Sequence, residues 1–192
     1  MPQNAARHAY LITAHDKPEQ LKLLLSLLDD SNNDLYLHID KKAAGIQNSD
    51  LTGAIKKASI QFVPRLDARW GSEVFIDAIA SLIREAVKTE HAYYHLLSGV
   101  DLPLKPQQEI RAYFTEHAGK EFVAFDQKSA DQRVLVQRLG RYSFRRPVGP
   151  FAIRAYKRFE PVWNKLQSAL GVNRIKRCPV VFQKGAVWFS IT

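Results

Sequence analysis

The sequence has only one cysteine, Cys178, so it cannot close an internal disulfide. Nothing in its composition therefore requires an oxidising compartment. No apolar run approaches the roughly 20 residues of a membrane-spanning helix, and residues 1–16 lack the apolar core and cleavage site of a signal peptide. We therefore expect a cytoplasmic protein, and we leave open a peripheral association with the inner face of the membrane.

The sequence also lacks the signatures of several common enzyme classes. It has no GxxxxGKS/T phosphate loop, no GxGxxG, no HExxH, no GxSxG and no paired-cysteine zinc spacing. It contains no Asp-x-Asp, the sequence with which many nucleotide-sugar enzymes bind Mg²⁺ or Mn²⁺. These absences leave nucleotide-sugar chemistry as a strong candidate, with Lys and Arg side chains neutralising the diphosphate instead of a metal.

Basic charge is concentrated in one part of the chain. The formal net charge is +9, and residues 133–184 carry 13 Lys and Arg against a single acid, Glu160. Such a segment can attract a nucleic acid, anionic lipid head groups or the diphosphate of an activated sugar, or it can be a solvated surface without a specific ligand. Aromatic residues among the arginines, such as Tyr142 and Trp163, are compatible with nucleic-acid binding, but we rank that reading last and expect no nucleic-acid partner.

Strands and helices alternate along most of the chain. Short apolar runs predict strands at the following residues: 8–14, 34–39, 60–63, 93–97 and 121–125. Apolar residues at helical spacing follow the first and third of these runs, and Asp16 and Pro18 are placed to start the first helix as N-cap and early-helix proline. The alternation predicts an α/β fold with a mostly parallel sheet and helices on both faces.

The last third of the chain has a different character. After the strand at residues 121–125 come an arginine-rich stretch, a helix predicted over residues 151–170 and a final apolar strand at residues 186–192. A strand with nothing after it is an unusual end for a domain. We therefore expect the C-terminal part of the domain to be truncated.

Residues that follow strand ends are the first candidates for a site, because open α/β sheets bind ligands beyond the carboxyl ends of their strands. The candidates found in this way are His15, Asp40, Arg65, Ser98 and Asp101. Each has a structural alternative, since histidines at strand ends can satisfy local backbone groups and aspartates can form turns. We favour a binding role for the two aspartates because of their positions.

Five segments of the sequence together resemble a known family. They are residues 8–15 (HAYLITAH), 35–42 (LYLHIDKK), 70–71 (WG), 94–103 (YHLLSGVDLP) and 184–189 (KGAVWF). In order and spacing they are similar to the Core-2/I-branching N-acetylglucosaminyltransferase family, in a short form that looks like its bacterial members. No single segment carries the resemblance alone, but together they extend over almost the whole chain.

The resemblance implies a GT-A-like, Rossmann-type fold and an inverting transfer of a sugar from a UDP-sugar to a glycan acceptor. N-acetylglucosamine is the expected sugar, xylose is the alternative found in xylosyltransferase relatives, and neither a metal nor another cofactor is expected. We expect a single domain over residues 1–192, with a nucleotide-sugar-binding half at residues 1–120. The start of a basic, acceptor-side half follows at residues 121–192.

The resemblance and the strand-end positions together give the predicted site. The donor-binding residues are His15, His38, Asp40, Arg65, Trp70, Gly71, Ser98 and Asp101. The acceptor-binding residues are Asp126, Arg138 and Arg141.

The catalytic base of the reaction is not identified. An inverting transferase needs a carboxylate to accept the proton of the attacking hydroxyl, and the family places this glutamate downstream of the strand that contains Trp188 and Phe189. We therefore expect this chain to lack part of its active site. A noncatalytic remnant that still binds a nucleotide or a glycan is the alternative.

Overall fold

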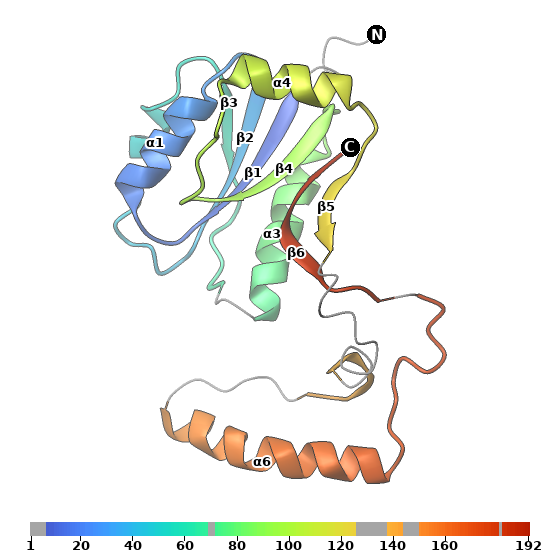
Figure 1. Ribbon diagram of the computed structural model, residues 1–192. Helices are drawn as coiled ribbons and strands as arrows, with labels where there is room; N and C mark the ends of the chain where they lie inside the picture. Colours follow the sequence, from blue (N-terminus) through green and yellow to red (C-terminus); the bar gives the residue numbers. More distant parts are fainter. Residues whose placement is uncertain (1–6, 69–71, 126–137, 144–149, 181) are drawn as a thin grey trace. The chain divides into compact units, whose positions relative to one another are not determined.

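The computed structural model describes residues 7–68, 72–125, 138–143, 150–180 and 182–192 (Figure 1). The chain divides into two compact units. The first comprises Met1–Val123 together with Val187–Thr192, and the second comprises Ala124–Ala186.

A six-stranded sheet with the order β3-β2-β1-β4-β6-β5 forms the centre of the fold. Its strands are β1 (His8–Ala14), β2 (Asn33–Ile39), β3 (Ser59–Phe62), β4 (Tyr93–Ser98), β5 (Phe122–Phe125) and β6 (Gly185–Ile191). Strand β1 pairs in parallel with β2 and β4, β2 pairs in parallel with β3, and β6 runs antiparallel to β4. The predicted α/β fold with a mostly parallel, GT-A-like sheet is therefore confirmed.

The helices are α1 (Pro18–Leu28), α2 (Asn48–Thr52), α3 (Glu73–Ala86), α4 (Gln107–Glu116) and α6 (Pro150–Ala169). Pro18 begins α1, as predicted, but Asp16 as its N-cap is wrong: Lys17 precedes the helix in a left-handed conformation with φ of 51°. A left-handed residue at this place turns the chain into the helix by its backbone alone. Within the described residues, no helix is both long enough and apolar enough to cross a bilayer.

Apolar residues alternate between the two faces of the sheet, because successive side chains of a strand point to opposite sides. In β1, Tyr10, Ile12 and Ala14 pack against the leucine stripe of α1, whose members are Leu21, Leu24, Leu25 and Leu28. Ala9 and Leu11 point the other way and pack against Leu82 and Ala86 of α3. The fold thus has one apolar core on each face, as expected for helices on both sides of a sheet.

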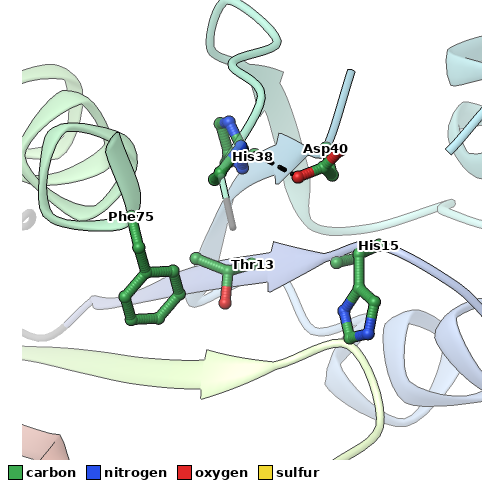
Figure 2. A pocket seen from close by; sticks show the side chains of 7 residues that line it. Thr13, His15, His38, Asp40 and Phe75 are labelled. Carbon is green, nitrogen blue, oxygen red and sulfur yellow. Dashed lines mark hydrogen bonds between the residues drawn. The ribbon is translucent and has the colours of Figure 1, made fainter. Parts of the chain in front are cut away.

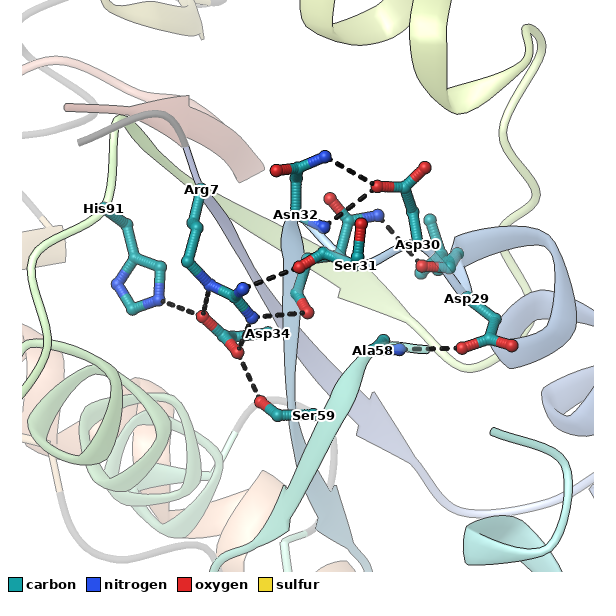
Figure 3. A network of polar contacts seen from close by, with 11 residues as sticks. Arg7, Asp29, Asp30, Ser31, Asn32, Asp34, Ala58, Ser59 and His91 are labelled. Atoms are coloured by element: carbon teal, nitrogen blue, oxygen red, sulfur yellow. Dashed lines mark hydrogen bonds and ion pairs between the residues drawn. The ribbon is translucent and has the colours of Figure 1, made fainter. Parts of the chain in front are cut away.

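A polar network lies at the edge where the parallel strands begin (Figure 3). The buried carboxylate of Asp34 accepts hydrogen bonds from Arg7 Nε at 2.7 Å and from Ser59 Oγ, and it lies 3.0 Å from His91 Nε2. Burial by itself would raise the pKa of Asp34, but the hydrogen bonds from His91, Arg7 and Ser59 outweigh it and hold that pKa well below its usual range. All these partners are intramolecular, so this network is structural.

The second unit is organised around one buried polar side chain of α6. Gln167 is 2% exposed and binds the backbone of Tyr142 twice, accepting its N–H at 2.7 Å and donating to its carbonyl at 3.0 Å. The indole N–H of Trp163 donates to the same carbonyl at 3.0 Å, and Arg174 lies 5.4 Å from the centre of the Tyr142 ring. One face of α6 is therefore attached to the segment around Tyr142.

Candidate functional site

A small pocket opens at the edge of the sheet where the parallel strands end (Figure 2). It encloses about 250 Å³ of empty space, part of which is open solvent, and it is lined by Thr13, Ala14, His15, His38, Asp40, Ala68 and Phe75. Figure 2 shows Thr13 and His15 coming from β1 and its end, His38 and Asp40 from the end of β2, and Phe75 from α3. The pocket contains three of the predicted donor-binding residues.

The sheet topology explains why the pocket forms at this place. The chain proceeds from β1 outward to β2 and β3, and then returns to the other side of β1 to form β4. Such a reversal of strand order is where open α/β sheets bind ligands, because the connecting loops separate there. The pocket lies beside this point, at the end of β1.

Close backbone packing brings the end of β1 against the turn after β4. Gly99 donates its backbone N–H to the carbonyl of Thr13 at 2.8 Å. A Cβ atom on Gly99 would lie 2.7 Å from the Cβ of Ala14, closer than side-chain carbons approach one another. Glycine is therefore required here by contact distance rather than by an unusual φ.

His38 is a buried, neutral histidine with one ring nitrogen already occupied. It is 1% exposed, and its Nε2 accepts a hydrogen bond from the backbone N–H of Leu66 at 3.1 Å. Burial lowers the pKa of His38, and the nearby Asp40 only partly opposes that effect. Since Nε2 accepts a hydrogen bond, the proton of the neutral ring is on Nδ1, which makes His38 a donor through that nitrogen.

Asp40 combines a lining position with a structural role. Its side chain is buried, and its Oδ1 accepts the backbone N–H of Lys42 at 2.8 Å while Oδ2 accepts that of Ala68 at 3.0 Å. The ammonium group of Lys42 lies 4.0 Å from Asp40 and forms a second ion pair with Asp67. Asp40 thus holds the wall of the pocket that contains Ala68.

Three other predicted donor-binding residues do not line this pocket. The guanidinium group of Arg65 donates to the carbonyls of Ala43 and Ile46, at 3.3 and 2.6 Å, and to Asn48 Oδ1 at 2.9 Å. Asp101 accepts the backbone N–H of Ser98 at 2.7 Å and so closes the turn after β4. The hydrogen bonds of Arg65 and Asp101 therefore stabilise loops of the fold. Ser98 is paired in register with the pocket residue Thr13, but it does not line the pocket itself.

The remaining predicted site residues lie either outside the described residues or in the second unit. Trp70, Gly71 and Asp126 lie outside the described residues. Arg138 and Arg141 belong to the second unit, where Arg138 is exposed and Arg141 donates to Ser168 Oγ at 2.7 Å.

Sequence reasoning missed several residues of the pocket. Thr13 is a polar residue near the end of a mainly apolar strand. Its hydroxyl is the signal in the sequence that could have indicated the pocket. Phe75 belongs to the apolar side of α3, but it is only half-buried and lines the pocket. Ala68 carries no chemical signal, and only the fold brings it to this place.

The pocket is lined by both polar and apolar side chains and has few charged groups. His15 is exposed, with a side-chain exposure of 73%, and its Nε2 lies 3.6 Å from the carboxylate of Asp16. The cations Lys17 and Lys41 are exposed and follow the ends of β1 and β2 at this same edge. Within the described part of the chain, no three His, Cys, Asp or Glu side chains are grouped as metal ligands.

Comparison with known proteins finds two xylosyltransferases and one matching protein family. A xylosyltransferase of Ciona intestinalis is 20% identical over 139 residues, which are 70% of this chain and 16% of that protein. The xylosyltransferase sqv-6 of Caenorhabditis briggsae is 27% identical over 110 residues, 55% of this chain and 14% of that protein. This chain thus spans only a small part of the length of these relatives. Residues 8–192 match the Core-2/I-branching enzyme family, and the chain belongs to that family.

Proposed function

We propose that this chain provides the donor-binding part of a glycosyltransferase that moves a sugar from a UDP-sugar to a hydroxyl of a glycan acceptor. The observation that supports this proposal best is the pocket at the carboxyl ends of β1 and β2, in a chain that matches the Core-2/I-branching family. The proposed reaction is a direct displacement at the anomeric carbon. The acceptor oxygen forms the new bond, UDP leaves with the electron pair of the old one, and the acceptor proton passes to a base.

The residues that line the pocket support binding of the uridine part of the donor. The ring of Phe75 offers an apolar surface for a planar base, and the hydroxyl of Thr13 offers a polar partner. We therefore assign the nucleoside to this pocket.

The diphosphate would then extend toward the exposed cations at the same sheet edge. Lys17 and Lys41 are placed after the two strand ends that border the pocket. A positive charge near a leaving phosphate lowers the cost of the negative charge that develops there. These side chains support our proposal that donor binding needs no divalent metal.

N-acetylglucosamine is our proposed donor sugar, and xylose is the alternative to be compared with it. The two similar proteins named above are xylosyltransferases, and that name describes those proteins. The choice between the sugars is made by calorimetric titration with UDP-N-acetylglucosamine and UDP-xylose in parallel, since this chain is expected to lack its catalytic base.

The test of the proposal is calorimetric titration with UDP in the presence and absence of EDTA. We expect the same affinity in both conditions, and weaker binding of ADP because the base contacts differ. Loss of UDP binding on addition of EDTA would refute metal independence, and equal binding of ADP and UDP would refute the nucleoside assignment.

A noncatalytic binding protein is the second candidate, and one observation favours it. The two strand-end carboxylates, Asp40 and Asp101, are both engaged with backbone N–H groups, and neither is proposed as the base. Under this alternative the chain binds UDP but forms no product from either UDP-sugar with any acceptor. Measured turnover would exclude it.

A further inference from the structure

One face of α6 exposes a continuous row of large apolar side chains. These are Phe151, Phe159, Val162 and Leu166 of α6 and Leu170 in the turn directly after it, here called the α6 stripe, and they are between 49% and 87% exposed. Their separations of eight, three, four and four residues place them on the same side of a helix. A soluble helix normally buries such a row against a core, so this exposure requires an explanation.

The stripe has a basic border on one side. Arg154, Arg158 and Lys165 are all exposed, and their separations of four and seven residues place them in a row next to the stripe. The acid of this helix, Glu160, lies on another side, where it accepts a hydrogen bond from the hydroxyl of Tyr156 at 2.8 Å. No carboxylate of α6 therefore neutralises the basic border.

The flank of the stripe away from the basic border is already occupied, and there the ring of Trp163 also stacks on Phe159 with 6.5 Å between ring centres. Trp163 and Gln167 are hydrogen-bonded to the carbonyl of Tyr142, each at 3.0 Å. The surface of α6 therefore consists of an attached side, an exposed apolar stripe and a basic border next to that stripe. Figure 1 shows α6 as one long, uninterrupted helix.

We propose that the α6 stripe docks onto the surface of an anionic lipid bilayer. A helix that lies in the membrane interface inserts its apolar side below the head groups, while Lys and Arg beside it contact lipid phosphates. Charge complementarity selects this occupant over a second copy of the chain, because two copies joined by their stripes would bring their basic borders together. The proposal is independent of the pocket and of the reaction proposed above.

The test is sedimentation of the full chain with phosphatidylcholine vesicles that either contain or lack phosphatidylglycerol. We expect binding to the anionic vesicles, weakened by salt, and little binding to the neutral ones. The variant Val162→Gln/Leu166→Gln keeps the charge and should bind at least about tenfold more weakly, because two apolar side chains no longer enter the bilayer. The variant Arg154→Gln/Arg158→Gln/Lys165→Gln should lose about a hundredfold, at about fivefold for each charge.

Each variant has a matched control elsewhere on the surface. Ile76→Gln/Leu104→Gln replaces two apolar side chains that are 66% and 96% exposed but lie outside α6. Lys56→Gln/Lys57→Gln/Lys105→Gln removes the same charge from exposed positions of the first unit. Both controls should bind the anionic vesicles within about twofold of the unmodified chain, since they leave the stripe and its border intact. Circular dichroism of every variant verifies the fold.

Three results would overturn the proposal. One is failure of the unmodified chain to bind anionic vesicles at low salt. Another is equal loss of binding in a variant and its control, which would mean general attraction by a positive protein. The last is self-association of the chain without lipid that Val162→Gln/Leu166→Gln abolishes, since the stripe would then be covered by a second copy.

Discussion

One carboxylate oxygen of Asp40 accepts the backbone N–H of Ala68 at 3.0 Å, and this contact fixes a wall of the candidate pocket. We expect Asp40→Asn to lower the free energy of unfolding by about 1–3 kcal/mol, because the amide NH₂ would face a backbone N–H and leave a buried donor unpaired. UDP affinity should fall with it. Urea denaturation and calorimetry measure the two effects.

A matched control for Asp40→Asn is Asp77→Asn, which makes the same chemical change at an exposed position of α3. It should alter the free energy of unfolding by less than about 0.5 kcal/mol, as is usual for surface positions. If the two variants are equally stable, Asp40 does not hold the wall.

A substitution of His15 tests ligand binding without a change in stability, because its side chain is 73% exposed and lines the pocket. We expect His15→Ala to leave the unfolding midpoint unchanged and to weaken UDP binding by about fivefold, which corresponds to one lost hydrogen bond. Calorimetry of His15→Ala beside His117→Ala, a partly exposed histidine that does not line the pocket, provides the comparison. Unchanged affinity in both would move the nucleoside away from His15.

The close approach at Gly99 predicts a large cost for one added methyl group. In Gly99→Ala the new Cβ would meet the Cβ of Ala14 at 2.7 Å and the Cα of Ala14 at 3.3 Å. Overpacking of this kind costs about 1–3 kcal/mol, since backbone atoms have to move. Gly45→Ala, with nothing within 4 Å of the new atom, is the control and should change little. Equal melting temperatures of the two variants would contradict the prediction.

Two buried histidines predict acid sensitivity in a defined pH range. His95 Nε2 lies 3.0 Å from His8 Nδ1, and burial lowers the pKa of both rings below the ordinary 6.5, to about 4 for His8. The unfolded chain therefore binds more protons as the pH falls through 6.5, so the free energy of unfolding decreases from there toward pH 4. Each ring contributes at most about 1.4 kcal/mol per pH unit.

Denaturant unfolding at several pH values between 7.5 and 4.5 measures this loss of stability. The carboxylates with lowered pKa, including Asp34, respond below their ordinary value of 3.8 and so do not interfere. His95→Gln removes one titrating ring and should make the pH dependence shallower, whereas His117→Gln, at a partly exposed histidine outside this pair, should leave it as it is. A stability that stays constant down to pH 4.5 would contradict the assignment.

The sequence predicted the parts of the fold that depend on local pattern. The apolar run of β1 and the leucine stripe of α1 are recognisable because every second or every third to fourth residue faces a core. Helix α4 was missed although Ile110, Tyr113 and Phe114 have helical spacing, because polar residues surround them. The N-cap was misplaced because the left-handed Lys17 begins the helix without a side-chain cap.

The candidate site was predictable where it depends on strand ends. Position alone placed His15 and Asp40 at the pocket, since parallel strands bring their carboxyl ends to one edge, and the family resemblance added His38. Position did not show that Arg65 donates three hydrogen bonds to backbone and side-chain oxygens of a neighbouring loop. Phe75 reaches the pocket only through the packing of α3, which no local pattern encodes.

The central place of β1 also has a consequence for how the chain folds. The register pairs His8 of β1 with Asn33 of the next strand, and with Tyr93, which follows only after two more helices. Contacts between residues so far apart in sequence form slowly, because a long loop must close before they can stabilise anything. One edge of β1 therefore stays unpaired during synthesis until the residues of β4 have left the ribosome. During that interval this edge can pair with a wrong strand.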